Sequence, residues 1–222
     1  MVNLSVVFGT YNRFAHLQGC VESIRKYVTR PYEIIIADGG STDGGREWMV
    51  AQDDIIMIGE RTLHGAVDAY NKAFSISFGQ YVAHLNDDCY LQDNCLDAAC
   101  DIMDKEENIG QVAIPFNDDH PRKTLNYIHM GNISILYANF GVVRKTVGDM
   151  VGWWGNYLHT YGGDCELSFQ IWNAGYRVVP LRGYALYHHR VNDALRRENV
   201  ESRKFFVKWD GKVSQKWDSK EG

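Results

Sequence analysis

The sequence has no long hydrophobic run and no N-terminal targeting signal. Its longest apolar runs fall well short of the ~18 residues that a helix needs to cross a bilayer. The chain passes straight into the strand-like stretch LSVVFGT, without the basic segment, apolar core and cleavage site of a signal peptide. From these absences we expect a soluble, cytoplasmic protein.

Cysteine and the common glycine-rich nucleotide motifs are also scarce. The five cysteines are an odd number with no CxxC pair, which argues against a disulfide framework or a zinc site, and we interpret all of them as structural thiols. No GxGxxG motif and no Walker lysine occur, which argues against the usual dinucleotide- and ATP-binding folds. A formal net charge of -5 argues against a general nucleic-acid binder, so we expect no nucleic-acid partner.

What the sequence does have is an alternation of strand-like and helix-like segments. Apolar runs at 4–8, 32–38 and 55–58 predict strands, and the run that ends at Asn86 predicts a fourth. Between them lie stretches with apolar residues at three- and four-residue steps, which is typical of amphipathic helices. A chain of 222 residues that is 45% hydrophobic can bury a full core as one domain. The alternation predicts an α/β fold with a doubly wound, mostly parallel central sheet.

The second half of the sequence predicts further strands and one helix. Runs at 111–116 and 139–144 predict strands, and the stretch YALYHH predicts a closing strand that ends in two histidines. Segment 164–176 predicts a helix that Asp164 caps and Gly175 stops.

Polar residues follow three of the predicted strands, at 9–13, 38–45 and 86–88. Ligands of doubly wound sheets bind beyond the carboxyl ends of the strands, where these three segments meet. Polar side chains and flexible backbone in the first two segments are suited to contact with a nucleotide. The sequence therefore predicts one polar crevice at this edge of the sheet.

The third polar segment holds two adjacent carboxylates, Asp87 and Asp88, which repel each other at the edge of an apolar sheet. With Asn86 they offer the hard oxygen ligands that Mg²⁺ or Mn²⁺ prefers, although the same residues are also typical of a simple turn. His188, at the end of the closing strand, could complete such a site with an imidazole, or it could be a packed surface histidine.

Asp164 has two interpretations. A carboxylate at a helix N-terminus is usually a cap. Because YGG precedes it and Glu166 follows on the same turn, Asp164 could instead be a general base that faces the crevice.

Six stretches together carry a resemblance to a known family. They are FGTYNR, IIIADGGSTDGG, GAVDAYNKAF, GQYVAHLNDD, YGGDCELSFQIWNAGYRVV and YHH. In order and spacing they resemble the inverting nucleotide-sugar glycosyltransferases of family two, over most of the chain from Leu4 to His189. The resemblance implies a GT-A fold, with helices on both faces of the sheet and a C-terminal extension on the acceptor side. It implies one catalytic domain at 1–190, made of a nucleotide-binding half (1–88) and an acceptor half (89–190), followed by a basic and aromatic extension at 191–222.

The resemblance also implies an activity and a cofactor. The activity is metal-dependent transfer of a sugar, with inversion, from a nucleoside diphosphate sugar to a hydroxyl of a carbohydrate or lipid-linked acceptor, as in polysaccharide biosynthesis. A uridine diphosphate sugar is the expected donor, and Mn²⁺ or Mg²⁺ the expected cofactor.

Residue roles follow from the same resemblance. Asp88 corresponds to the principal metal ligand of a DxD-type motif, with His188 beside it, and Asp164 to the base. The implied nucleotide-sugar contacts are Thr10, Tyr11, Arg13, Asp38, Asp68, Asn71, Asn86 and Asp87. Three positions depart from the family pattern: Asn86 replaces an acid, Gly39 stands where a second acid is frequent, and Gly163 stands where a Glu often precedes the base. Because of the last departure, Glu166 could share the acidic role on the acceptor side.

Two further features concern the acceptor. Trp153 and Trp154 precede the predicted base by about ten residues, and either ring could be a platform for a sugar or could fill the core. We expect one ring in the core and one beside the crevice. The basic and aromatic extension could make peripheral contact with the inner face of a membrane, but we favour a tail that folds back over its own domain.

Three competing interpretations remain open. A nucleotidyltransferase that makes a nucleotide sugar shares the sheet and the acidic ligands, but it should carry a glycine-rich loop with Arg and Lys after the first strand, which GTYNRFAH lacks. A receiver-like module should carry an acid cluster around the end of the first strand, which the sequence lacks, and a carbohydrate-binding module would not need an acid such as Asp164. A protein of the same fold that only binds nucleotide sugars, without turnover, is the third.

Overall fold

A seven-stranded sheet forms the centre of the protein. The structure is a computed structural model that describes residues 2–118, 124–189, 191 and 201–219. The sheet has the order β11-β6-β10-β4-β1-β2-β3, and only β10 runs antiparallel to its neighbours. Its strands are β1 (Leu4–Thr10), β2 (Tyr32–Asp38), β3 (Ile55–Gly59), β4 (Tyr81–His84), β6 (Ile109–Ala113), β10 (Gly141–Arg144) and β11 (Arg177–Pro180). The predicted doubly wound, mostly parallel sheet is confirmed.

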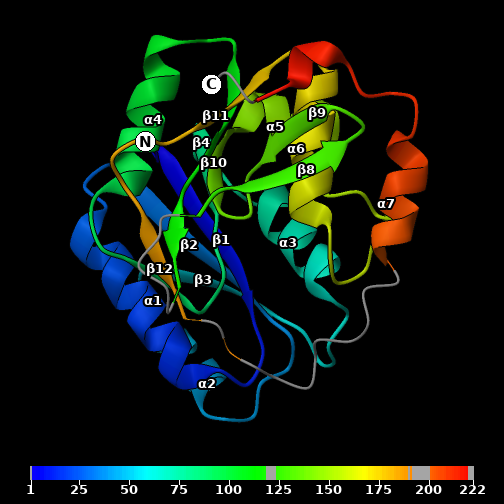
Figure 1. Cartoon of the computed structure of the whole chain (residues 1–222). Helices are drawn as coiled ribbons and strands as arrows, with labels where there is room; N and C mark the ends of the chain where they lie inside the picture. Colours follow the sequence, from blue (N-terminus) through cyan, green and yellow to red (C-terminus); the bar gives the residue numbers. More distant parts are fainter. Residues whose placement is uncertain (1, 119–123, 190, 192–200, 220–222) are drawn as a thin grey trace.

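Helices cover both faces of this sheet (Figure 1). They are α1 (Phe14–Tyr27), α2 (Gly45–Val50), α3 (Ala66–Ser75), α4 (Cys95–Lys105), α5 (Lys145–Val151) and α6 (Gly163–Asn173). The chain steps from β1 to β2 to β3 in one direction and then returns across β1 to β4. Because such crossovers are right-handed, α1 and α2 lie on one face and α3 lies on the other. This arrangement agrees with the fold that the resemblance implies.

The strands of the first half are buried on both sides, as their apolar sequences predict. Val6, Val7 and Phe8 of β1 have no exposed surface, and neither have Ile34 and Ile35 of β2. Sequence pattern alone therefore defines the core here, because a central parallel strand needs apolar residues on both faces.

Two smaller sheets lie beside the main one. One has the order β5-β12-β7, with β5 (Cys89–Leu91), β7 (Phe116–Asn117) and β12 (Leu186–His188). The other is a hairpin of β8 (Asn126–Met130) and β9 (Ile133–Tyr137). The predicted closing strand YALYHH is thus a strand, but it belongs to the small sheet and pairs with β5, directly after the acidic segment. The sequence analysis did not predict the hairpin or α4.

The N-cap of helix α6 lies two residues before the predicted one. It is Gly162, which has φ +85°, and no side chain of the described residues caps the helix. Asp164 is therefore not the cap, but a residue of the first turn. Gly175, with φ +86°, follows the end of the helix as predicted.

The C-terminal segment packs back onto the domain. Helix α7 (Glu201–Trp209) and the 3-10 turn η1 (Gln215–Trp217) place Phe205, Trp209 and Trp217 around Phe169 of α6, in a second apolar cluster. The expectation that this tail folds over its own domain is confirmed for its described part, while residues 192–200 lie outside the described ranges. Among the residues that the structure describes, no helix has the length and apolar character that a bilayer crossing requires.

Candidate active site

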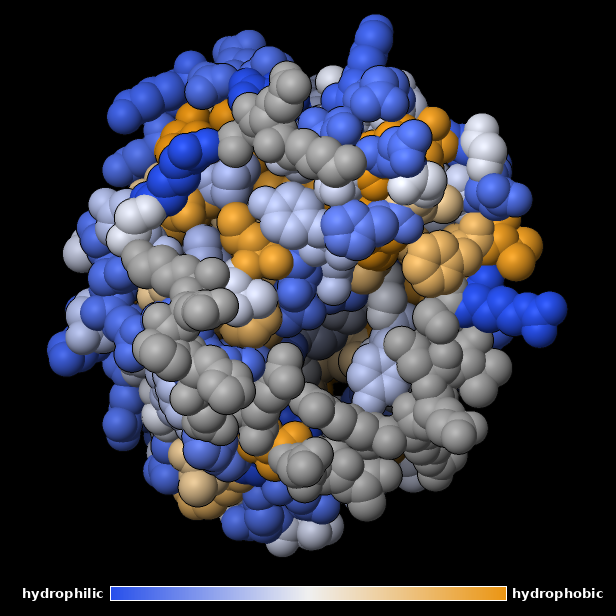
Figure 2. All heavy atoms as spheres, in the orientation of Figure 1, coloured by the Kyte–Doolittle hydropathy of each residue, from blue (hydrophilic) through white to orange (hydrophobic). Residues whose placement is uncertain are grey.

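A cavity of about 940 Å³ lies at the carboxyl ends of β1, β2 and β4. Figure 2, drawn in the orientation of Figure 1, shows a hollow on the face toward the viewer, with hydrophilic residues toward its centre. The predicted site residues that line it are Thr10, Tyr11, Arg13, Asn86, Asp87, Asp88, Trp154, Asp164 and His188. The convergence predicted for the three strand ends therefore takes place, and residues from the second half of the chain complete the cavity.

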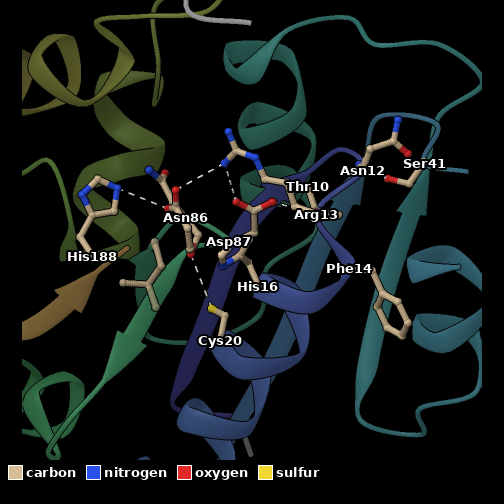
Figure 3. Close-up of polar contacts among 12 residues, drawn as sticks. Thr10, Asn12, Arg13, Phe14, His16, Cys20, Ser41, Asn86, Asp87 and His188 are labelled. Atoms are coloured by element: carbon tan, nitrogen blue, oxygen red, sulfur yellow. Dashed lines mark hydrogen bonds and ion pairs between the residues drawn. The ribbon is translucent and has the colours of Figure 1, made fainter. Parts of the chain in front are cut away.

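Arg13 is the positive group that offsets the two adjacent carboxylates. Its guanidinium lies 3.0 Å from Asp87 Oδ1 and 3.5 Å from Asp88 Oδ2. Thr10 donates its hydroxyl to the second oxygen of Asp87 at 2.8 Å (Figure 3). Burial nevertheless raises the pKa of Asp87 to about 6, against the opposing effect of Arg13. The loop after β1 thus fixes the loop after β4 by charge and hydrogen bonding.

The loop after β1 is itself tied to the loop after β2. The backbone N–H of Asn12 donates to Ser41 Oγ at 2.9 Å, and the N–H of Thr42 donates to Asn12 Oδ1 at 2.8 Å. Asn12 has φ 51°, in the left-handed region that Asn tolerates better than most residues. The three strand-end loops are therefore linked into one rim (Figure 3).

Asp88 faces His188 across the junction of β5 and β12. His188 Nε2 lies 3.4 Å from Asp88 Oδ1, and both side chains are almost fully buried. Burial works to raise the pKa of Asp88, but His188 and Arg13 outweigh it and hold that pKa below its ordinary value. The backbone N–H of His189 donates to the carbonyl of Asp88 at 2.9 Å, which keeps the pair in register.

The Asp88 and His188 pair has the donor atoms of a divalent cation site. Asp88 Oδ1 and His188 Nδ1 are buried and have no hydrogen-bond partner among the described residues. A ligand atom of Cys89 lies within 4.8 Å of theirs. Burial raises the pKa of the Cys89 thiol well above its ordinary value, so that this sulfur stays protonated and is a poor ligand. A carboxylate and an imidazole beside an open cavity fit Mn²⁺ or Mg²⁺ that takes its other ligands from phosphate or water.

Asp164 lines the cavity from another element, the first turn of α6. Its Oδ1 accepts the backbone N–H of Cys165 at 2.9 Å. Burial raises the pKa of Asp164 to about 6, and no charged group among the described residues opposes that effect. A carboxylate with a pKa in this range can take a proton near neutral pH.

The two tryptophans occupy different positions. Trp153 does not line the cavity: its ring stacks on Phe74 at 4.3 Å, and its Nε1–H donates to Asp149 at 2.9 Å. Trp154 lines the cavity and stacks on Tyr70 at 4.2 Å. Both rings are largely buried.

Two predicted nucleotide contacts, Asp38 and Asp68, do not line the cavity. Asp38 is fully buried, and its carboxylate accepts the backbone N–H groups of Gly40 and Ser41. It shapes the turn after β2 instead, since a buried carboxylate needs donors. Asp68 points along α3 and pairs with Lys72 at 2.5 Å.

Asn71 also lies outside the cavity lining. Its side-chain amide donates to the carbonyl of Trp154 at 2.9 Å and accepts the N–H of the same residue at 3.1 Å. Asn71 therefore holds the backbone of the loop that carries Trp154.

Glu166, expected on the acceptor side, faces away from the cavity. Its carboxylate has no exposed surface and is bonded by Tyr157, Lys208 and Trp209. It cannot share the acidic role of Asp164 in this position. The donors come from α7 and from the loop before α6, which a sequence pattern does not connect to position 166.

Several cavity residues were not predicted. Tyr137, at the end of β9, and Asn139, just after it, line the cavity from the hairpin. His159 and Tyr161 line it from the loop before α6. The signal for the first pair was the alternation around Gly131 in NYIHMGNISILY, which is typical of a hairpin. For the second pair the only signal was their closeness to Asp164 in the sequence.

The chain belongs to glycosyl transferase family 2. The model of that family matches residues 5–159, well over half of the chain. The chain is 31% identical over 98 residues to glycosyltransferase GlyG of Streptococcus pneumoniae, which covers 42% of this chain and 33% of GlyG. It is 24% identical over 195 residues to glycosyltransferase AglE of Haloferax volcanii, which covers 79% of this chain and 63% of AglE. The chain thus spans from a third to under two thirds of these relatives.

Solved structures with the same fold include S. aureus TarS 1-349. In complex with UDP-GlcNAc, TarS superposes with a TM-score of 0.75 at 14% sequence identity, over 97% of this chain and 69% of TarS. In complex with UDP, the TM-score is 0.70 at 16% identity, over 85% of this chain and 61% of TarS. At these identities the likeness shows the GT-A fold alone.

Proposed function

We propose that this protein is a metal-dependent, inverting glycosyltransferase that uses a nucleoside diphosphate sugar, with Asp164 as the general base. The observation that carries the proposal is the arrangement of one cavity, with the Asp88 and His188 pair on one wall and Asp164 on another. Family membership supports the reaction class.

The diphosphate would lie on the acidic wall. Asp88 and His188 would hold Mn²⁺ or Mg²⁺, which supplies positive charge to the departing nucleoside diphosphate when bound. Arg13 keeps Asp87 and Asp88 together and brings its own charge to the same wall. Asn86, whose side-chain oxygen accepts the Tyr70 hydroxyl at 3.0 Å, is held beside them for contact with the sugar or diphosphate.

The nucleoside would lie over the ends of β1 and β2. Tyr11 and Leu63 line the cavity there, and both lie close to Gly39, where a Cβ would meet Leu63 at 2.7 Å and Tyr11 at 3.4 Å. An aromatic and an aliphatic side chain around a glycine suit a planar base. Thr10 and Tyr11 would border the ribose. Uridine is the proposed base, and the UDP complexes of the similarly folded TarS support the choice.

The transfer step needs one proton acceptor. Asp164 takes the proton of the acceptor hydroxyl as its oxygen attacks the anomeric carbon. The bond from that carbon to the diphosphate oxygen breaks, and its electron pair leaves with the nucleoside diphosphate. Because attack comes from the face opposite the leaving group, the product anomer is inverted.

Trp154 is the proposed platform for the acceptor. It lines the cavity, and its indole Nε1 is buried without a hydrogen-bond partner in the described part of the chain. Apolar sugar faces pack on aromatic rings, and a free N–H can reach a hydroxyl. A carbohydrate or lipid-linked acceptor suits both features.

The outer side of α7 supports peripheral contact with the inner face of a membrane. Phe206 and Val207 are 45% and 72% exposed, beside the exposed Arg203 and Lys204. Basic and apolar groups together favour an anionic lipid surface, where lipid-linked acceptors lie. Binding to anionic vesicles, compared between the wild type and Phe206→Ser, tests this contact.

The proposed function is tested by donor turnover. The protein is incubated with UDP, GDP and TDP sugars in the presence of Mn²⁺, Mg²⁺ or chelator, and release of nucleoside diphosphate is measured. We expect slow, metal-dependent release from a UDP sugar, and a product of inverted anomeric configuration by NMR. Tight UDP binding without release from any donor would instead favour a binding protein of the same fold.

A further inference from the structure

The C-terminal helix α7 bonds the buried carboxylate of Glu166, which lies two residues after the proposed base in α6. Trp209 donates its Nε1–H to Glu166 Oε2 at 2.7 Å, and Lys208 donates to Oε1. Glu166 is fully buried, whereas the Lys208 side chain is 36% exposed. A buried carboxylate without a cation is strongly destabilising, so the ammonium of Lys208 is needed where it lies.

The same carboxylate also bonds the loop before α6. The Tyr157 hydroxyl donates to Glu166 Oε2 at 2.5 Å, and the Lys208 ammonium lies 4.7 Å from the centre of the Tyr157 ring. Burial and this hydrogen bond raise the pKa of Tyr157, so that it remains a donor. Glu166 thus joins α6, α7 and the loop 152–162 at one point.

That loop and the first turn of α6 form one wall of the cavity. Trp154, His159 and Tyr161 line it from the loop, and Asp164 lines it from the helix. The loop packs tightly against the helix start, since a Cβ on Gly163 would meet the Trp154 ring at 2.2 Å. A shift of α7 would therefore displace both Trp154, the proposed platform, and Asp164, the proposed base.

We infer that Lys208 and Trp209 are positioning residues, which act through Glu166 and Tyr157 to hold the base helix and the loop 152–162 in their working geometry. The inference rests on the proposed function for its catalytic consequence. It gives the C-terminal tail a role in the reaction, because small displacements of a catalytic group lower the rate steeply.

The test combines hydrogen exchange with donor turnover. Lys208→Met removes the cation from the buried carboxyl group of Glu166, whereas the double variant Lys208→Met/Glu166→Gln removes both charged groups and keeps an acceptor for Trp209. Lys212→Met is the matched control, because Lys212 is exposed on the same tail and its side chain does not contact Glu166.

In Lys208→Met we expect the amides of 152–166 to exchange at least about ten-fold faster, while those of β1 and β4 are unchanged. Turnover of a UDP sugar per UDP-binding site should fall by about ten-fold or more with UDP affinity unchanged. The double variant should recover both properties, and Lys212→Met should resemble the wild type.

Unchanged exchange in 152–166 of Lys208→Met would overturn the inference. If Lys208→Met does not fold, Trp209→Phe replaces it, with Trp217→Phe as the control that changes a ring of the same apolar cluster. Faster exchange of 152–166 in Trp209→Phe but not in Trp217→Phe supports the inference. Equal exchange of this segment in the two variants overturns it. If the wild type turns over no donor, the proposed function fails, and the exchange measurement still decides the role of α7.

Discussion

Two aspartates that line one cavity from different elements have different surroundings, which give the same side chain different properties. Asp88 lies 3.4 Å from His188 and 3.5 Å from Arg13, and its pKa is below the ordinary value although it is buried. Asp164 accepts a backbone N–H, and burial raises its pKa to about 6 without an opposing charge in the part of the chain that the structure describes. The first is suited to stay charged and hold a cation, and the second to exchange a proton near neutral pH.

The largest expected effect on donor binding comes from removal of the first aspartate. Asp88→Ala should abolish metal-dependent donor binding, a loss of more than about 100-fold in UDP affinity with Mn²⁺, because the carboxylate is the charged ligand of the pair. Calorimetric titration of UDP with Mn²⁺ and with chelator measures it. Equal UDP affinity of the variant and the wild type in both conditions would remove Asp88 from the site.

The two tryptophans should differ in their effects on stability and on acceptor kinetics. Trp153→Ala should lower the free energy of unfolding by about 3–5 kcal/mol, since the ring is stacked in the core and away from the cavity. Trp154→Phe should lower the free energy of unfolding by less. It should raise the acceptor KM and leave donor hydrolysis nearly unchanged, since water needs no platform. Urea unfolding and steady-state kinetics measure the pair. Equal losses of stability with no kinetic change in either variant would contradict the platform.

Asp164 should also affect stability in a pH-dependent way. Its folded pKa of about 6 lies above the ordinary 3.8, so ionisation disfavours the folded state: the penalty develops between these values and is complete above about 6. Asp164→Asn should therefore raise the free energy of unfolding at pH 7.5, by at most about 3 kcal/mol, and leave it nearly unchanged at pH 4. Urea titrations at both pH values decide this, and a variant that is less stable at pH 7.5 would refute the assigned pKa.

The smallest expected effect comes from the imidazole that faces Asp88. His188→Ala should weaken Mn²⁺-dependent UDP binding by about 10- to 100-fold, because Asp88 and the diphosphate remain as ligands. The measurement is a Mn²⁺ titration at fixed UDP, with His189→Ala as the neighbouring control. Superimposable curves for His188→Ala and the wild type would make His188 a structural residue.

The acidic side of the cavity, where we propose that the donor binds, could be predicted from the sequence, because local patterns determine it. Parallel strands bring their carboxyl ends to one edge, so segments around Thr10 and Asp88 were certain to meet once the strands were recognised. The partner of the acids, Arg13, lies in the first of these segments. Position at the sheet edge, rather than any single motif, made the prediction reliable.

The part of the cavity around Asp164 could be predicted only in part. Asp164 was found because an acid follows YGG at a helix start, but the orientation of Glu166 depends on Lys208 and Trp209, which are far away in the sequence. Asp38 likewise faces inward, because backbone N–H groups of the turn after β2 donate to its carboxylate. The sequence pattern does not predict these hydrogen bonds. The strand at 186–188 was predicted, but its partners β5 and β7 are too short to produce a clear alternation, and so the small sheet was not predicted.

The division of tasks between the two walls is tested most directly by kinetics and binding of Asp164→Asn. The variant should bind UDP with Mn²⁺ within about two-fold of the wild type, while kcat for donor turnover falls by about 10²–10⁴-fold. The kcat of the wild type should rise with pH and level off above about 6, where Asp164 is ionised. A variant that keeps its kcat, or that loses UDP binding together with turnover, would contradict the assignment of Asp164 as the base.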